Sequence, residues 1–171
     1  MLSRRQFIKA GVLGGAVLAA AGAWFGVAYH SGMGGAGHLN DDARSVLAAV
    51  VPVMLAEALP EGSGRPAAIA ATVDRFGVAV GGLGAAAQKE VGELFGLLSF
   101  PPTRFLVAGV HRPWPDAAGE EVAAFLGAWR FSRFALLRSA YAALHDLIYA
   151  AWYGNPESWP AIDYPGPPEV S

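Results

Sequence analysis

Apolar side chains between Asn40 and Tyr153 recur at intervals of three and four residues, which is the spacing of amphipathic α-helices. Asn40 and the two aspartates after it are typical of a helix start, because the amide oxygen caps free backbone N–H groups and the carboxylates oppose the helix dipole. No alternating pattern of a strand hairpin interrupts this region. The sequence therefore predicts an all-α fold, a small helical bundle over residues 40–155.

Prolines and glycines divide the helical region into separate elements. Pro52 predicts a kink, because proline removes one backbone donor. The predicted helices run from Ala43 to about Leu59, from Pro66 to about Val80, from Ala85 to Leu98 and, as a short piece, from Thr103 to Ala108. A longer helical run follows Asp116 and is expected to divide near Gly127 or Arg130.

The final helical run carries two lines of apolar residues. The first line is Phe134, Leu137, Tyr141, Leu144, Ile148 and Trp152, and the second is Leu136, Ala140, Ala143, Leu147 and Ala151. The two lines lie roughly 100° apart on a helix of 3.6 residues per turn. They predict a central helix of the bundle that is covered on more than one side. Gly154 and Pro156 then end the run.

Residues 156–171 are predicted to form an extended tail rich in proline and aromatic side chains. Proline lowers the entropy that a segment loses when it docks, so this tail is pre-shaped to bind a surface. That surface is either the chain's own helices or another protein. The candidate partner contacts are Trp152, Tyr153, Trp159 and Tyr164.

The N-terminus has the pattern of an export signal. Ser3-Arg4-Arg5-Gln6-Phe7-Ile8-Lys9 closely matches the twin-arginine motif, with Arg4, Arg5 and Phe7 as the signal residues. A Gly/Ala-rich run without charge follows over residues 10–29. Residues 1–30 are therefore predicted to be a signal segment that directs the chain through the twin-arginine (Tat) translocase to the periplasm.

Two fates are open for this segment. Ala21-Gly22-Ala23 offers a small-x-small cleavage site, which would release the domain. Alternatively, residues 10–29 approach the ~20 apolar residues that cross a bilayer, and would tether the domain to the inner membrane.

A Gly-rich linker is predicted over residues 31–39. Its stretch Gly32-Met33-Gly34-Gly35-Ala36-Gly37 spells the G-x-G-x-x-G motif of dinucleotide-binding proteins. That motif requires a preceding strand and a βαβ pattern. Neither pattern surrounds these glycines, so the linker interpretation is favoured.

Composition excludes several classes of function. Cysteine is absent, which excludes disulfides, Cys-ligated zinc, iron–sulfur clusters and covalently attached c-type haem. Without Arg4, Arg5 and Lys9, 9 basic side chains remain against 14 acidic ones, so no nucleic-acid partner is expected. Only 15% of the residues are charged, against about 25% in soluble domains. This apolar excess favours contact with a partner or a membrane.

The histidines lack the neighbours that catalysis requires. His111, in its proline-rich loop, has no nucleophile, orienting acid or metal partner at a recognisable spacing, and His145, among polar neighbours, is predicted to be a surface histidine. No catalytic, cofactor-binding or metal-binding residue is therefore predicted. Arg130 and Arg133, close to Trp129, are candidates for stacking on aromatic rings, for anchoring an acidic partner or for internal salt bridges.

Several segments together resemble the gluconate 2-dehydrogenase subunit 3 family. The similarity covers the signal Ser3–Lys9, the stretch from Leu39-Asn40-Asp41-Asp42 through Leu47 to Pro52, Phe125-Leu126 with Trp129, Arg130, Ser132 and Arg133, and the C-terminal Ala151-Trp152-Tyr153-Gly154-Asn155-Pro156, Trp159 and Tyr164-Pro165-Gly166-Pro167-Pro168. The tail is the most specific part of this match.

The resemblance implies a small accessory subunit exported by the twin-arginine route. Its partner would be a large flavoprotein of the glucose–methanol–choline (GMC) class, often joined by a cytochrome c subunit. FAD and the oxidation of a sugar or alcohol would belong to the large subunit, and the small one would bind no cofactor. It would carry its signal-less partner through the export pore and stabilise it. The alternative is a stand-alone exported helical binding protein.

Overall fold

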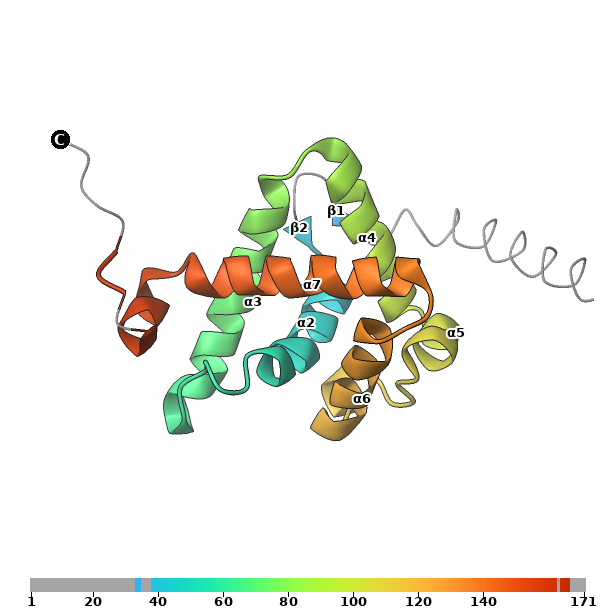
Figure 1. Cartoon of the computed structure of the whole chain (residues 1–171), viewed down its shortest axis with the longest axis horizontal. Helices are drawn as coiled ribbons and strands as arrows, with labels where there is room; N and C mark the ends of the chain where they lie inside the picture. The colour runs from blue at the N-terminus through green and yellow to red at the C-terminus, as the bar shows by residue number, and fades with distance from the viewer. Residues whose placement is uncertain (1–32, 35–37, 163, 167–171) are drawn as a thin grey trace, which may run out of the picture.

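The prediction of an all-α fold is confirmed. The computed structural model describes residues 33–34, 38–162 and 164–166. Within these residues the chain forms six α-helices (Figure 1), which are α2 (Asp41–Met54), α3 (Arg65–Gly81), α4 (Ala85–Ser99), α5 (Pro101–Thr103), α6 (Gly119–Arg130) and α7 (Ala135–Tyr153).

Short turns and one small ladder complete the described part. The turns are the 3₁₀ segments η2 (Gly62–Gly64), η4 (Trp114–Asp116) and η5 (Pro156–Ile162) and the π-helical turn η3 (Arg104–Ala108). Strands β1 (Met33–Gly34) and β2 (His38–Leu39) pair antiparallel within the stretch predicted as a linker. Backbone pairing thus gives regular structure to a segment whose side chains show no strand pattern.

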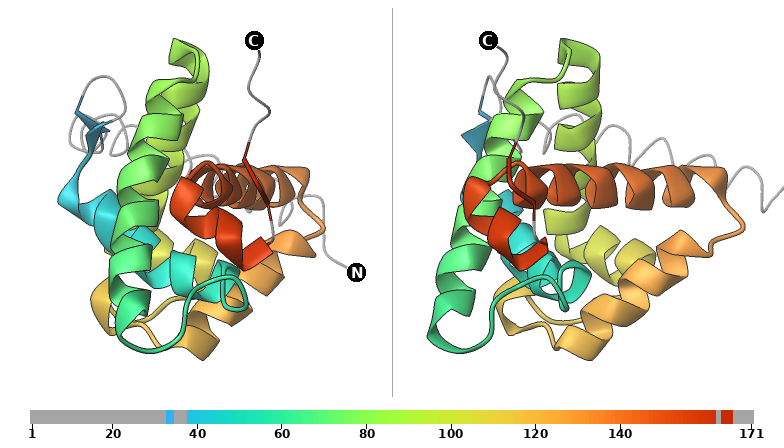
Figure 2. Two further views of the ribbon diagram at one scale, coloured as in Figure 1. Left: turned by 90° about the vertical axis from the view of Figure 1, so that its left-hand side faces the viewer. Right: turned by 60° about the vertical axis from the view of Figure 1, so that its left-hand side comes forward.

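Helix α2 occupies the centre of the bundle. Its residues Ala43, Val46, Leu47, Val50 and Val51 are fully buried, and α3, α4, α6 and α7 all contact it. Figure 2 shows α2 running behind α3 and beneath α7. Helix α2 therefore presents the most completely buried apolar face, while α7 contacts α3, α6 and α2 and is covered on more than one side, as predicted.

Helix α2 starts where the sequence predicts a cap, whereas it ends earlier than predicted. Asn40 Oδ1 accepts a hydrogen bond from the Ala43 N–H at 2.8 Å, as an N-cap does. The helix ends at Met54 rather than near Leu59, and Leu55 begins a turn closed by the Leu59 N–H on the Leu55 carbonyl at 3.0 Å. This turn lets Leu55 and Leu59 both enter the core.

Helices α6 and α7 divide immediately after Arg130, as predicted. Residues 131–134 form the connection, in which Ser132 Oγ accepts from the Phe134 N–H at 3.1 Å. The Arg138 guanidinium donates to the Ser132 carbonyl at 2.7 Å. These two bonds fix the shape of a short exposed turn.

Helix α7 buries only part of its two predicted apolar lines. Leu144, Ile148, Ala151 and Trp152 are core residues, and they pack mainly against α3 and α6. Leu136, near the start of the helix, remains 79% exposed. The half of α7 nearer the tail is therefore covered by the bundle, while the other half projects from it (Figure 2, right).

The described part of the tail docks on the chain's own last helix. Ser158 is buried and its hydroxyl donates to the Trp152 carbonyl at 2.9 Å, while Trp159 Nε1 donates to the Tyr153 carbonyl at 2.8 Å. Gly166 adopts a φ of 100° beside the Trp159 ring. The prediction of an extended tail needs correction over Pro156–Ile162, because the carbonyls at the end of α7 draw this segment into a 3₁₀ helix.

The signal residues Arg4, Arg5 and Phe7 and the predicted tether over residues 10–29 lie outside the described residues. Among the helices that the structure does describe, none combines the length and the apolar character needed to cross a membrane.

A pair of leucine substitutions tests the central role of α2. Leu47→Ala removes a fully buried side chain and should lower the free energy of unfolding by about 2–5 kcal/mol. Leu136→Ala removes the same atoms from an exposed position and should change it by less than about 0.5 kcal/mol. Urea denaturation followed by circular dichroism measures both, and equal losses would contradict the assignment.

Candidate partner-binding groove

The structure separates the four predicted partner contacts into two environments. Trp152 is buried in the core, whereas Tyr153 and Tyr164 are exposed and Trp159 is half-buried. The ring centroids of Trp159 and Tyr164 lie 5.3 Å apart in an edge-to-face contact. Trp159 also bonds to the backbone of Tyr153. Three of the four residues are thus brought together at one end of α7, and Trp152 anchors that end from inside.

An aromatic stripe runs along α7 toward this end. It consists of Tyr141, His145, Tyr149 and Tyr153, which are spaced four residues apart and therefore share one helix face. His145 stacks on Tyr149 with ring centroids 4.2 Å apart and planes at 22°. Tyr141 and Tyr153 flank this pair at 5.9 Å from their neighbours. By the helical rise, the stripe is ~18 Å long.

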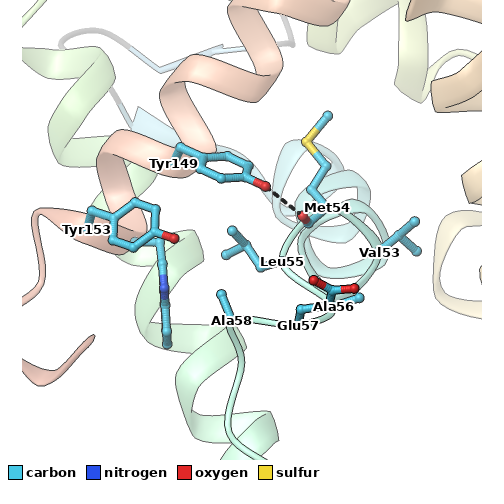
Figure 3. A pocket seen from close by; sticks show the side chains of 9 residues that line it. Val53, Met54, Leu55, Ala56, Glu57, Ala58, Tyr149 and Tyr153 are labelled. Carbon is cyan, nitrogen blue, oxygen red and sulfur yellow. Dashed lines mark hydrogen bonds between the residues drawn. The ribbon is translucent and has the colours of Figure 1, made fainter. Parts of the chain in front are cut away.

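Two hollows lie beside the aromatic stripe and form one groove, which we call the α7 groove. The first, of about 450 Å³, lies between Tyr149, Tyr153 and the end of α2 with the turn that follows it (Val53–Ala58). The second, of about 650 Å³, lies between the stripe and α6. Val53, Met54 and Tyr149 border both hollows. Figure 3 shows the first hollow, with the Tyr149 hydroxyl directed at the backbone of Met54.

A third hollow continues the groove to the tail. It measures about 420 Å³ and lies between the turn after α2, the start of α3 and the buried Asn155 and Ser158. Glu57, Ala58 and Trp152 border both this hollow and the first one. The groove therefore extends from the α6–α7 connection to the base of the tail.

Polar groups are placed along the groove at intervals. The Tyr149 hydroxyl donates to the Met54 carbonyl at 3.1 Å and so ties α7 to α2. His145 Nδ1 lies 2.9 Å from Asp146 Oδ1. At the α6 end, the Arg130 guanidinium lies 6.0 Å from the centre of the Tyr141 ring, within the range of a cation–π contact. The groove thus offers aromatic faces with a cation at one end.

This arrangement is suited to binding. Aromatic side chains supply large contact areas and hydrogen-bonding hydroxyls, which is why they are enriched where proteins associate. His145 is paired with its own sequence neighbour, Asp146, and stacked between tyrosines. Over the described ranges, no group of three or more His, Asp or Glu side chains has a metal-binding arrangement.

His111 serves as a clasp between the proline-rich loop and α6. Its backbone N–H donates to Glu121 Oε1 at 2.5 Å, and its Nδ1 lies 3.1 Å from the same oxygen. The imidazole also meets the Phe105 ring edge-to-face at 4.8 Å. The backbone hydrogen bond is the main reason that the pKa of Glu121 lies below its ordinary value of 4.5, against an opposing effect of desolvation.

The sequence analysis did not single out Tyr141, His145 and Tyr149 as one surface. It assigned Tyr141 to an apolar line and made no prediction that joined these three side chains. Their i, i+4 spacing with Tyr153 was the available signal, since such a spacing places aromatic rings above one another on a helix. What the spacing alone could not show is that α2 ends beside them and leaves the stripe only partly covered.

No protein-family model matches this chain, and comparisons with curated proteins and with solved structures find no match. The role of the α7 groove is therefore inferred from its own geometry and from the sequence motifs.

The clasp predicts a pH-dependent stability. Because the pKa of Glu121 is lowered in the folded state, its carboxylate stabilises the fold above the unfolded pKa, and this contribution is lost as the pH falls through the folded pKa. Glu121→Gln should therefore lower the melting temperature near neutral pH and have a smaller effect below about pH 4.

Glu120→Gln is the matched control, because Glu120 is an exposed acid in the same first turn of α6. Its melting temperature should follow that of the parent protein across the pH range. A deficit in Glu121→Gln that is the same at both pH values would show that the clasp does not depend on charge.

Proposed function

We propose that this chain is a non-catalytic accessory subunit of an exported, membrane-associated FAD-dependent sugar or alcohol dehydrogenase. In this proposal it binds a folded GMC-type flavoprotein in the cytoplasm, lends it the Arg4-Arg5 signal and stabilises it after export to the periplasm. The observation that carries the proposal is an export signal of the twin-arginine type on a helical domain with a long, open aromatic groove.

The choice of export route supports a partner. The twin-arginine pathway moves proteins that are already folded, so a cofactor-loaded flavoprotein without its own signal can cross together with a subunit that has one. This division leaves FAD and the oxidation chemistry to the large subunit and, where present, electron transfer to a cytochrome c subunit. The small subunit then needs a binding surface and a signal.

The α7 groove is the surface best suited to that partner. Its three hollows follow one another beside α7, and the exposed Tyr153 and Tyr164 stand at its tail end. Tyrosines that become buried when two proteins associate are frequent hot spots of binding energy. Hydrogen bonds from Trp159 and Ser158 already hold the tail on α7. The outer side of the tail therefore extends the binding surface.

A stand-alone exported binding protein is the second candidate function. The hollow of about 650 Å³ favours it, because ligand pockets commonly measure about 300–1,000 Å³. Native mass spectrometry of the chain purified from the periplasm distinguishes the two. A bound small molecule without any protein partner would favour the binding protein, whereas a complex with a flavoprotein would favour the accessory subunit.

Replacing Arg4 and Arg5 by lysine tests the export role. Both charges are kept while the twin-arginine motif is lost, so the dehydrogenase activity of the partner should remain in the cytoplasm. Activity is measured in periplasmic and cytoplasmic fractions, with Arg75→Lys in α3 as the control that should leave export unchanged. Unchanged export of the partner in the Arg4→Lys, Arg5→Lys variant would refute the proposal.

Replacing Tyr141 and Tyr153 by alanine tests the groove. Both side chains border it, so the affinity for the flavoprotein should fall about tenfold or more, the effect expected when an interface aromatic is lost. Pull-down with a tagged chain measures this, and Val78→Ala, an exposed apolar position on α3, is the control. Full retention of the flavoprotein by a variant with unchanged helicity would place the interface elsewhere.

A further inference from the structure

The connection between α6 and α7 carries a second surface, which adjoins the α6 end of the α7 groove and shares Arg130 and Phe131 with its second hollow. Over residues 130–138 the chain reads RFSRFALLR, which holds three of its 12 basic side chains and no acidic one. We call the six residues Arg130, Phe131, Arg133, Phe134, Leu136 and Arg138 the basic–aromatic corner. In Figures 1 and 2 the corner lies at the opposite end of α7 from the tail.

The apolar members of the corner are open to solvent. Phe131 and Leu136 are each 79% exposed and Phe134 is 56% exposed. Single exposed apolar residues are common on protein surfaces, but two phenylalanines and a leucine within six residues form a patch that water solvates poorly. An exposed apolar patch of this kind is typical of a surface that binds a protein or a membrane.

The arginines of the corner are not neutralised within the described part of the chain. None of the four ion pairs there includes Arg130, Arg133 or Arg138. Instead, the Arg130 guanidinium lies 5.3 Å from the centre of the Phe131 ring and that of Arg133 lies 4.7 Å from the centre of the Phe134 ring. The corner therefore presents positive charge and aromatic rings together on a chain whose overall charge is negative.

We propose that the basic–aromatic corner binds the surface of an anionic lipid bilayer. Arginines attract the lipid phosphates, while aromatic and aliphatic side chains enter the boundary between head groups and acyl chains. Shape favours a bilayer over a protein. A stable protein interface buries about 800 Å² on each partner, whereas this corner is built around a four-residue turn that stands at the edge of the described fold in the right-hand view of Figure 2.

The turn holds this surface in a fixed shape. Ser132 bonds through its hydroxyl to the Phe134 N–H and through its carbonyl to the Arg138 guanidinium. The two phenylalanines therefore enter the bilayer without first losing much conformational freedom. By the helical rise, the 19 residues of α7 place the tail end ~28 Å from the corner. A corner at the membrane thus leaves the tail end of the groove accessible to a partner.

A single fluorescent label tests the contact directly in the full chain. Because the chain has no cysteine, Phe131→Cys provides one site for a polarity-sensitive dye, and Val78→Cys provides an equally exposed control on α3. With vesicles of phosphatidylglycerol and phosphatidylcholine in equal parts, the dye at position 131 should shift to the blue while the dye at 78 should not. Vesicles of phosphatidylcholine alone, or high salt, should abolish the shift.

Three results would overturn the proposal. The first is no shift at position 131 although the chain sediments with the anionic vesicles, because another segment would then hold the membrane. The second is an equal shift at both labelled positions. The third is a shift at 131 that requires the flavoprotein and not the vesicles, which would make the corner a protein interface.

A charge substitution gives a second, quantitative measurement. Arg133→Gln should weaken partitioning onto the anionic vesicles about fivefold, which corresponds to about 1 kcal/mol for one arginine near an anionic surface. Arg75→Gln removes an exposed arginine from α3 and should leave partitioning within about twofold of the parent chain. Circular dichroism checks that both variants remain helical. Equal weakening by the two variants would indicate a general charge effect and overturn the proposal.

Discussion

The burial of α2 is the constraint on which the rest of this structure depends. Five of its residues are fully buried, and four other helices pack around them. A helix with so wide an apolar face is stable only when other helices cover that face. Burial of α2 therefore fixes the positions of α3, α4, α6 and α7. The early end of α2 has a further consequence. The turn after Met54 brings Leu55 and Leu59 into the core and opens the space that becomes the α7 groove.

Helix α7 links two surfaces of different chemistry. One end carries Tyr153 and the docked tail, where Tyr153 borders the first hollow of the groove and the buried Ser158 borders the third. The other end carries the basic–aromatic corner, where arginines lie over phenylalanine rings. The groove arises because α2 ends early beside α7, whereas the corner arises because the first half of α7 carries no fully buried side chain. The separation of the two ends would let an accessory subunit meet a membrane and a protein partner at once.

Local signals in the sequence predicted where helices begin and break better than how deeply each helix is buried. Asn40 was recognised as a cap and Arg130 as a boundary, because caps and breaks depend on residues close in sequence. The apolar pattern did not show that α2 carries the most completely buried face, since an apolar line shows that a side is covered and not how completely. Trp152 was predicted both as part of a covered apolar line and as a candidate partner contact, and its side chain lies in the core.

The sequence by itself determined the helical class, the start of α2, the break between α6 and α7, the twin-arginine pattern and the aromatic content of the C-terminal region. Only the tertiary structure decided that Tyr141, His145, Tyr149 and Tyr153 border an open groove and that the tail docks on its own chain. It also decided that Arg130 and Arg133 stack on phenylalanines and form no salt bridge with another described residue. The physical reason is the range of the interactions. Helix capping and periodicity act within a few residues, whereas an uncovered face depends on where distant helices end.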